Sequence, residues 1–331
     1  MCGRKIPRVA IAGKEVDREW LCDHLARMIE AAERSLLEIL EDVRAALAGG
    51  AREIEVRALD PDRGRGLYPG ERVDGRVHRP YRVWLELAER LGLRMLTPAA
   101  DAGAEGDLVR LRFERLDPGR RLRPAGGDVT ERYGASSEFA RISKQEEPGF
   151  VLDFADALAR VPIATGARVL DLGVNTGDEL ALAMALAPAL AEASFVGVDH
   201  SESAIAVARA RFGARVSLHV ADLAALDALG LGTFELVISI GTLQSPGIDD
   251  REVVRRVVQR HLAPAGAVIF GFPNCRYLDG ELEHGARMKN FRQPELGLLV
   301  KDVAFYRKYL QQHHRRVFVT GQHYLFVTAI R

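Results

Sequence analysis

The segment from Arg168 to Asp199 constrains this chain more than any other part of its sequence. It reads RVLDLGVNTGDELALAMALAPALAEASFVGVD: an apolar run, a glycine-containing turn, an alanine-rich stretch and a second apolar run that ends on a carboxylate. This order predicts a β-strand, a tight loop, a crossover helix and a parallel strand tipped by an acid. Because an open α/β sheet binds ligands outside the carboxyl ends of its strands, the segment predicts a nucleoside-binding site.

The remainder of the C-terminal half continues the same rhythm. Near-continuous runs of Val, Ile, Leu and Phe predict parallel strands that are covered on both faces. The last part differs, because KDVAFYRKYLQQH predicts a helix and the two alternating segments after it predict an antiparallel hairpin at the edge of the sheet. The predicted strands after the first are 194–199, 216–222, 234–240 and 267–272, and the hairpin segments are 315–321 and 323–330.

The N-terminal part predicts a smaller α+β unit. Apolar residues recur every three or four positions from a cap at Asp17 to Gly49 and Gly50, which predicts one long amphipathic helix. Such a helix packs on its own domain or forms a homodimer seam. Strands at 52–59 and 107–116 and a helix at 81–93 complete the unit.

Two polar stretches connect these elements. The segment 61–80 is predicted to be a loop, and its basic side chains outnumber the nearby acids, which suits either a solvated loop or a phosphate-bearing partner. The segment 117–149 is polar and irregular and precedes a helix at 150–161. We therefore expect an N-terminal α+β domain at 1–116, which serves substrate recognition or dimerisation, a linker or lid with its helix at 117–160, and a cofactor-binding domain at 161–331.

Composition narrows the class of partner and the compartment. The 331 residues contain 46 Lys and Arg against 46 Asp and Glu, so no global field favours nucleic acid or anionic lipid. The three cysteines, Cys2, Cys22 and Cys275, have no CxxC spacing, which disfavours a disulfide framework and suits a reducing compartment. No run approaches the length of a membrane span or a signal peptide, so a cytoplasmic protein without membrane contact is expected. No metal site is predicted.

The C-terminal half resembles the class I S-adenosylmethionine-dependent methyltransferases. The resemblance rests on an acidic residue followed by spaced small residues after the first strand, on a second acid after the next strand, and on a parallel set closed by an antiparallel pair. It covers about half of the chain, from roughly 160 to 331, and it implies a seven-stranded Rossmann-like sheet and S-adenosyl-L-methionine as cofactor. Asp171, Gly173, Asn175 and Gly177 stand at the places of the family's first motif.

Each of these positions has a physical role in such a site. A residue without a Cβ lets backbone N–H groups approach the cofactor, and the helix N-terminus that follows favours its carboxylate. Asn175 departs from the family's usual glycine, although Asn tolerates the left-handed backbone better than most residues. By resemblance, Asp199 accepts hydrogen bonds from the ribose hydroxyls, and the adenine side of the site comprises His200, Asp222 and Leu223, with Ser239 as a further cofactor contact.

A dinucleotide-dependent dehydrogenase is the main alternative for this topology. Against it, the glycine spacing at 173 and 177 does not match GxGxxG, and Asp171 directly precedes the turn. The antiparallel ending also belongs to the methyltransferase pattern. We therefore expect an enzyme of this class, with a non-catalytic methyltransferase-like interaction module left as an alternative because of Asn175.

The methyl acceptor is less constrained. The stretch SIGTLQSP at 239–246 lacks the Asn/Asp-Pro-Pro-aromatic motif of members that methylate amide or base nitrogen, so an oxygen of a small molecule is favoured. A second alternative is an RNA-binding protein or RNA methyltransferase that docks RNA through the basic loop residues of 63–82. The stretch after the fifth predicted strand supplies catalytic candidates, His284 and Tyr277, and substrate-binding candidates, Asn274, Arg276 and Arg287.

Overall fold

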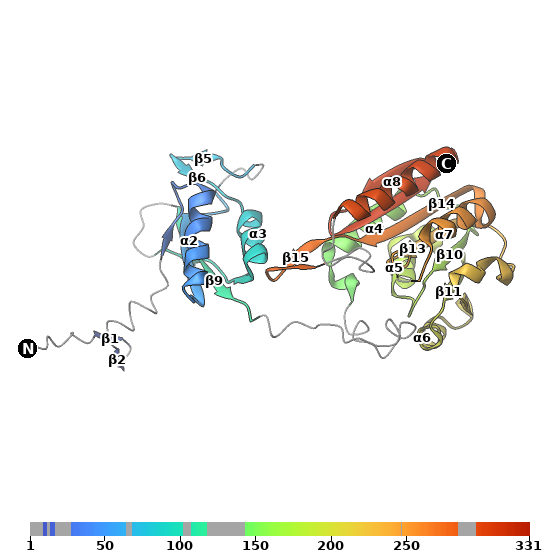
Figure 1. Ribbon diagram of the computed structural model, residues 1–331, viewed down its shortest axis with the longest axis horizontal. Coiled ribbons are helices and arrows are strands. Elements are labelled where there is room, and N and C mark those ends of the chain that lie inside the picture. The colour runs from blue at the N-terminus through green and yellow to red at the C-terminus, as the bar shows by residue number, and fades with distance from the viewer. Residues whose placement is uncertain are drawn as a thin grey trace, which may run out of the picture. The chain divides into compact units, whose positions relative to one another are not determined.

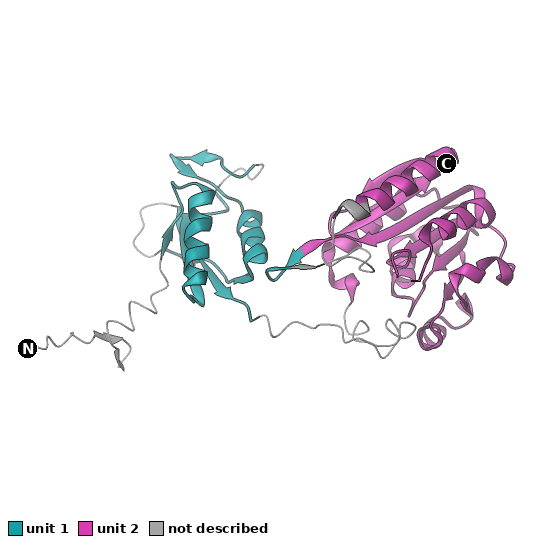
Figure 2. Ribbon diagram, in the orientation of Figure 1, with its two compact units in different colours: residues 1–121, 277–282 teal, residues 122–276, 283–331 magenta. Residues whose placement is uncertain are grey.

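We describe the fold from a computed structural model, which describes residues 28–63, 68–101, 107–117, 143–245, 247–283 and 296–331, together with two short strands, β1 (Val9–Ile11) and β2 (Lys14–Val16). The chain divides into two compact units (Figure 2). Unit 1 comprises residues 1–121 and 277–282, and unit 2 comprises 122–276 and 283–331. Within the described residues, no helix combines the length and the apolar character needed to cross a bilayer.

Among its described residues, unit 1 has a sheet against which the helices α2 and α3 pack (Figure 1). Its sheet follows the order β3-β4-β9-β7, with β8 also paired to β9. The apolar side chains of one sheet face, including Ile54, Val56 and Phe113, form a single buried cluster with Trp84 and other helix residues. The strands are β3 (Ile29–Glu30), β4 (Glu53–Leu59), β7 (Leu93–Met95), β8 (Ala99–Ala100) and β9 (Leu108–Arg115), and the helices are α2 (Leu36–Ala48) and α3 (Tyr81–Leu91).

The long N-terminal helix predicted from Asp17 to Gly49 is wrong over part of its length. The helix begins at Leu36, because Ser35 and Glu38 form a capping box that satisfies backbone N–H groups at this point. Upstream, Ile29 and Glu30 form a strand parallel to β4. The part of the prediction at 17–27 lies outside the described residues. A homodimer seam along one continuous helix therefore has no basis over 28–35.

The basic loop is more structured than its composition predicts. It contains a short hairpin, β5 (Arg72–Val73) with β6 (Arg76–Val77). His78 and Arg79 are buried: His78 Nε2 lies 2.8 Å from Pro61 O, and Arg79 donates to the carbonyls of Ala31 and Arg34. These two residues hold unit 1 together, so they are not surface contacts for a phosphate-bearing partner.

Unit 2 is built around the predicted α/β sheet. Among the described residues this sheet has seven strands, in the order β12-β11-β10-β13-β14-β18-β17. The strands from β10 to β14 are parallel, whereas β18 runs antiparallel to β14 and β17 antiparallel to β18, which confirms the predicted fold class. The strands are β10 (Arg168–Leu172), β11 (Ser194–Asp199), β12 (Val216–Val220), β13 (Phe234–Ile240), β14 (Leu262–Pro273), β17 (Arg316–Thr320) and β18 (Tyr324–Ile330).

Two apolar clusters cover the two faces of this sheet. Successive strand residues such as Val169 and Leu170 belong to different clusters, as expected where both faces of a strand are buried. The first three of the helices below pack on one face and the last two on the other (Figure 1). These helices are α4 (Pro148–Ala159), α5 (Asp178–Leu186), α6 (Glu202–Phe212), α7 (Asp250–Arg256) and α8 (Leu296–Gln312).

Shorter elements complete the two units. In unit 2, β14 begins at Leu262, five residues before the predicted strand, and a π-helical turn, η7 (Val257–His261), leads into it. The 3₁₀ turns are η3 (Lys144–Glu146), η4 (Pro188–Leu190), η5 (Gly213–Arg215) and η6 (Leu223–Leu229). A two-stranded hairpin, β15 (Arg276–Leu278) with β16 (Glu281–Glu283), follows β14, and its residues 277–282 belong to unit 1.

Candidate cofactor site

The loop after β10 has the backbone that its sequence predicts. Gly173, Asn175 and Gly177 all adopt positive φ angles, of 76°, 48° and 84°. Asn175 supports its own turn, because its Oδ1 accepts from the backbone N–H of Thr176 at 2.7 Å. The left-handed conformation that glycine would provide is thus kept by an Asn side chain bonded to the main chain.

Close packing fixes both glycines of this loop. A Cβ on Gly173 would collide with the Thr242 side chain, and a Cβ on Gly177 would collide with the ring of Phe212. Gly177 is also the cap of α5, whose first turn carries Asp178 and Glu179. The loop is therefore held between the segment after β13 and the end of α6.

Asp199 connects this loop to the second strand. It is the last residue of β11, it is 6% exposed, and its Oδ2 accepts from Asn175 N at 3.0 Å. Its Oδ1 accepts from Ser201 N at 2.9 Å, and His200 Nδ1 lies 3.5 Å away. A carboxylate has about four lone-pair sites, so Asp199 keeps capacity for two hydroxyl donors.

Asp171 lies near the acidic residues Glu179 and Asp199 and is buried within β10. Burial raises the pKa of its carboxyl well above the ordinary value, and the nearby charges of Glu179 and Asp199 raise it further, whereas Lys144 lowers it. Asp171 and Asp199 are thus close enough for their charges to interact. Neutralising one of them reduces the repulsion in this group.

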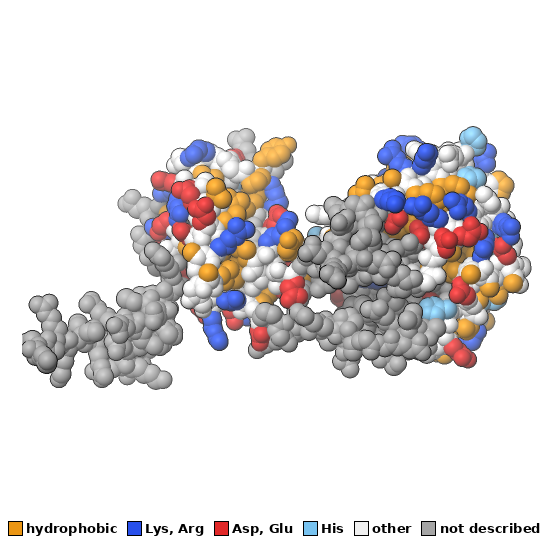
Figure 3. Space-filling model, in the orientation of Figure 1, with side chains coloured by type: hydrophobic (Ala, Val, Ile, Leu, Met, Phe, Trp, Pro, Cys, Tyr) orange, Lys and Arg blue, Asp and Glu red, His pale blue; other side chains and the backbone are white. Residues whose placement is uncertain are grey.

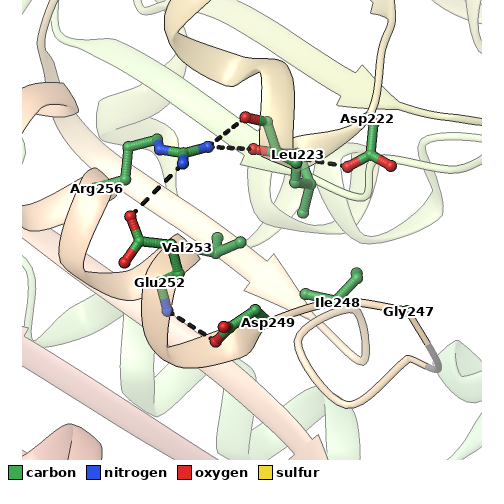
Figure 4. A pocket seen from close by; sticks show the side chains of 9 residues that line it. Asp222, Leu223, Gly247, Ile248, Asp249, Glu252, Val253 and Arg256 are labelled. Carbon is green, nitrogen blue, oxygen red and sulfur yellow. Dashed lines mark hydrogen bonds and ion pairs between the residues drawn. The ribbon is translucent and has the colours of Figure 1, made fainter.

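Asp222 and Leu223 line a cavity of about 50 Å³ at the end of the third strand. β12 ends at Val220, so the predicted strand end at Asp222 is two residues too long; Asp222 instead caps η6 by accepting from Ala224 N at 2.7 Å. In Figure 4, Arg256 reaches across to the Leu223 carbonyl and to Glu252. The opposite wall comes from Gly247, Ile248 and Asp249, together with Val253.

The remaining predicted residues take several positions. Ser239 is fully buried and donates to Leu172 O at 3.1 Å. Asn274 Nδ2 donates to Gln322 O at 2.9 Å, and Arg276 forms two hydrogen bonds with the carboxylate of Glu147. Tyr277 belongs to unit 1, where its ring lies 4.2 Å from the guanidinium carbon of Arg90. His284 and Arg287 lie outside the described residues.

A group of polar residues that the sequence did not indicate lies beside the glycine-containing loop. Lys144, in η3, places its Nζ 2.6 Å from Glu179 Oε1 and hydrogen-bonds the hydroxyl of Tyr324 on β18. Burial lowers the pKa of Lys144, but Tyr324 and Glu179 outweigh it, so the pKa lies above its ordinary value. Gln145 Nε2 donates to Asp178 O at 2.7 Å, which also ties η3 to α5.

Tyr324, the first residue of β18, lies beside the ends of β13 and β14 at the same edge of the sheet. A Cβ on Gly241, the residue after β13, would lie 2.7 Å from its hydroxyl, and Gly271 of β14 lies beneath its ring. Burial raises the pKa of Tyr324 to about 12, and the positive charge of Lys144 opposes this shift. The phenol therefore stays protonated at neutral pH, where it is a hydrogen-bond donor and not a base.

These observations define a class of protein. Asp171, Asp199 and Asp222 come at or just after the carboxyl ends of three adjacent parallel strands, and the Ala221 N–H bonded to Asp199 O at 2.9 Å joins the second end to the third. A left-handed loop and a helix N-terminus lie at the same edge. Unit 2 is therefore an α/β nucleoside-cofactor domain whose ligand crevice is at the carboxyl edge of the sheet.

Comparison with known proteins identifies that domain. Residues 169–266 match the family described as "Methyltransferase domain". A trans-aconitate 2-methyltransferase of Delftia acidovorans is 32% identical over 152 residues, which are 45% of this chain and 53% of the relative. A release factor glutamine methyltransferase of Geobacter sulfurreducens is 44% identical over 87 residues, 25% of this chain and 28% of the relative. These matches support a class I S-adenosylmethionine-dependent methyltransferase domain in the C-terminal part of the chain.

The extent of these matches is limited. The chain spans between about a quarter and about half of the length of the curated relatives it matches. Among solved structures, an O-methyltransferase family protein from Burkholderia thailandensis is 15% identical, covers 64% of this chain and 65% of its own, and has a TM-score of 0.43. An S-adenosylmethionine-dependent methyltransferase from Mesorhizobium loti is 20% identical over 56% of this chain and 99% of its own, with a TM-score of 0.38.

Proposed function

We propose that this chain is an enzyme that transfers the methyl group of S-adenosylmethionine to an oxygen of a small-molecule acceptor. The observation that carries the proposal is the meeting of three strand-end carboxylates and a left-handed loop at one edge of the parallel sheet. The methyltransferase match covers this region. The named activity of the Delftia relative, on trans-aconitate, supports a small acceptor that carries oxygen nucleophiles.

The residues at this edge fit the cofactor. The free lone pairs of Asp199 suit a ribose diol, and we assign the adenine side to Asp222, Leu223 and His200. The backbone N–H groups of the Gly173–Gly177 loop and the start of α5 suit a carboxylate. The Lys144 and Glu179 pair offers one charge of each sign beside that loop, which suits the ammonium and carboxylate of an amino acid.

The protein's own contribution to the reaction is alignment. When bound, S-adenosylmethionine supplies a methyl group that its sulfonium already activates. The chain has to hold the acceptor oxygen in line with the breaking bond and to exclude water, which is where most of the rate enhancement arises. The protonated Tyr324 orients an acceptor by donating to it, because at neutral pH it does not remove a proton.

A direct assay tests the proposal. The full chain is incubated with tritium-labelled S-adenosylmethionine and one acceptor. Separate reactions contain trans-aconitate, citrate, benzoate or total RNA. We expect label in a small acid and none in RNA, because basic and acidic side chains are interspersed over the visible faces (Figure 3) and two of the basic loop residues are buried. Label transfer to RNA alone would contradict the proposed acceptor class.

A further inference from the structure

Gln244 is a buried glutamine whose amide is unsatisfied. It is 8% exposed, and neither its Oε1 nor its Nε2 has a hydrogen-bond partner within the part of the chain that the structure describes. Other buried polar groups at the same edge are satisfied, since Ser239 donates to a carbonyl and Asp199 accepts from two backbone N–H groups. A buried amide without a partner is unfavourable, so its persistence needs an explanation such as a ligand.

The loop that carries Gln244 is fixed at the carboxyl edge of the sheet. It follows β13 directly, the Gly241 N–H donates to Gly271 O of β14 at 2.9 Å, and a turn closes through Ser245 N and Thr242 O at 2.8 Å. Thr242 packs against Gly173 of the cofactor loop, and Gly241 lies beside the Tyr324 hydroxyl. The loop therefore runs between the cofactor residues and Tyr324.

The order of the strands separates the two ligands. Asp171 and Asp199 lie at the ends of β10 and β11, and Asp222 follows β12; these three strands lie on one side of the β10–β13 boundary, where the strand order reverses. Gln244 follows β13 on the other side, together with β14 and β18. Because ligands lie in the crevice at such a boundary, the β13 side is where a second ligand meets the cofactor.

The chemistry of a primary amide indicates what that second ligand carries. Nε2 donates and Oε1 accepts in one plane. A carboxylate suits this edge, because one of its oxygens accepts from Nε2. Lys144, whose Nζ would lie 3.6 Å from a Cβ on Gly241 of this loop, is already paired with Glu179, so it does not bring an unpaired charge to the loop.

We propose that the Gln244 amide hydrogen-bonds the methyl acceptor and that the acceptor presents a carboxyl group to it. This inference rests on the proposed function and adds to it a specificity-determining residue and a chemical class of substrate. It also explains the unsatisfied amide, which is kept for a ligand at the expense of the stability of the free protein.

Gln244→Met in the full chain tests the inference, because methionine keeps the length of the side chain and removes both polar atoms. We expect the free variant to unfold about 2–4 °C above wild type, since an unpaired buried amide has been removed. Its affinity for S-adenosylhomocysteine stays unchanged, and its kcat/KM for the acid that wild type methylates, among trans-aconitate, citrate and benzoate, falls about tenfold or more.

Gln259→Met is the matched control. Gln259 is exposed and its Nε2 donates to Tyr309 Oη at 3.0 Å, so this variant leaves transfer unchanged and does not raise the Tm. The inference is overturned if Gln244→Met transfers as wild type does, if its Tm falls, or if it loses S-adenosylhomocysteine instead. It is also overturned if a wild type that binds S-adenosylhomocysteine methylates none of the three acids. A wild type that does not bind S-adenosylhomocysteine contradicts the proposed function itself.

Discussion

At the scale of single residues, the site combines conformation with charge. The glycines at 173 and 177 are needed for their positive φ and for the side chains that pack against them, and Asn175 shows that the middle position tolerates a residue that bonds its own turn. Asp171 contributes differently, because its carboxyl is buried near other acids. These two kinds of constraint give separate predictions.

Gly177→Ala should destabilise the protein more than Gly166→Ala. Both glycines have positive φ, of 84° and 74°, so both substitutions carry a strain of about 1–2 kcal/mol. Only at Gly177 does the new Cβ meet the Phe212 ring, which adds about 1–3 kcal/mol. Thermal unfolding of the two variants measures the difference. Equal losses of stability would show that the collision is relieved by movement of Phe212.

Asp171→Asn should stabilise the protein at neutral pH. The pKa of Asp171 is raised in the folded protein, so the unfolded chain releases this proton first, near its ordinary value of about 3.9. The stability that the neutral carboxyl provides is therefore present below that pH and is lost as the pH rises through the folded pKa. We expect the Tm advantage of Asp171→Asn to be small at pH 4 and to grow toward pH 8. An advantage independent of pH would contradict this assignment.

At the scale of elements, sequence patterns predicted the C-terminal half well. Continuous apolar runs bounded by glycine or acids identified β10, β11 and β13, because buried parallel strands require such runs. The predicted N-terminal helix was too long, because apolar residues keep a helical spacing upstream of Ser35. The capping box at Ser35 nevertheless starts the helix there. That signal, S-x-x-E before an apolar run, is visible in the sequence at Ser35 and Glu38.

Ser35→Ala should therefore weaken unit 1. Loss of the Ser35 Oγ acceptor for Glu38 N removes a helix cap, which costs about 1 kcal/mol. Asp17→Ala, at the cap expected from the sequence period, is the comparison. Chemical denaturation of both variants measures the two effects. A silent Ser35→Ala would show that α2 does not depend on this cap.

The turn η3 could not be assigned to the site from sequence. Lys144 lies in a polar stretch, and its partners Glu179 and Tyr324 are 35 and 180 positions away, so only the fold brings the three together. Gln244 was missed for a similar reason: a single glutamine in a loop has no pattern, and its burial without partners appears only in the structure.

Lys144→Met should distinguish the two ends of the cofactor. We expect weaker binding of S-adenosylhomocysteine, which has an amino-acid end, and unchanged binding of 5′-methylthioadenosine, which lacks it. The dissociation constant of S-adenosylhomocysteine divided by that of 5′-methylthioadenosine, both measured by calorimetry, should rise about tenfold, as for the loss of a charged hydrogen bond. Lys308→Met, on the exposed side of α8, is the control. Equal weakening of both ligands would place Lys144 outside the amino-acid end.

At the scale of the whole molecule, two units with separate apolar cores share one chain. The residues that we assign to the cofactor lie in unit 2, whereas residues 277–282, which come shortly after β14, belong to unit 1. There, Asp279 N donates to Glu89 Oε1 at 2.8 Å and Gly280 packs on Gly92. The chain thus passes from the seven-stranded sheet into unit 1 and back, so the two units are joined by more than one covalent connection.

The most direct measurement is calorimetric titration of S-adenosylhomocysteine into the full chain, into Asp222→Ala and into Glu192→Ala. Asp222 is exposed at the carboxyl edge of the sheet, and Glu192 is exposed before β11, at the amino edge. The account predicts one site per chain, binding weakened about tenfold in Asp222→Ala and binding unchanged in Glu192→Ala. No binding to wild type, or equal binding to all three proteins, would contradict it.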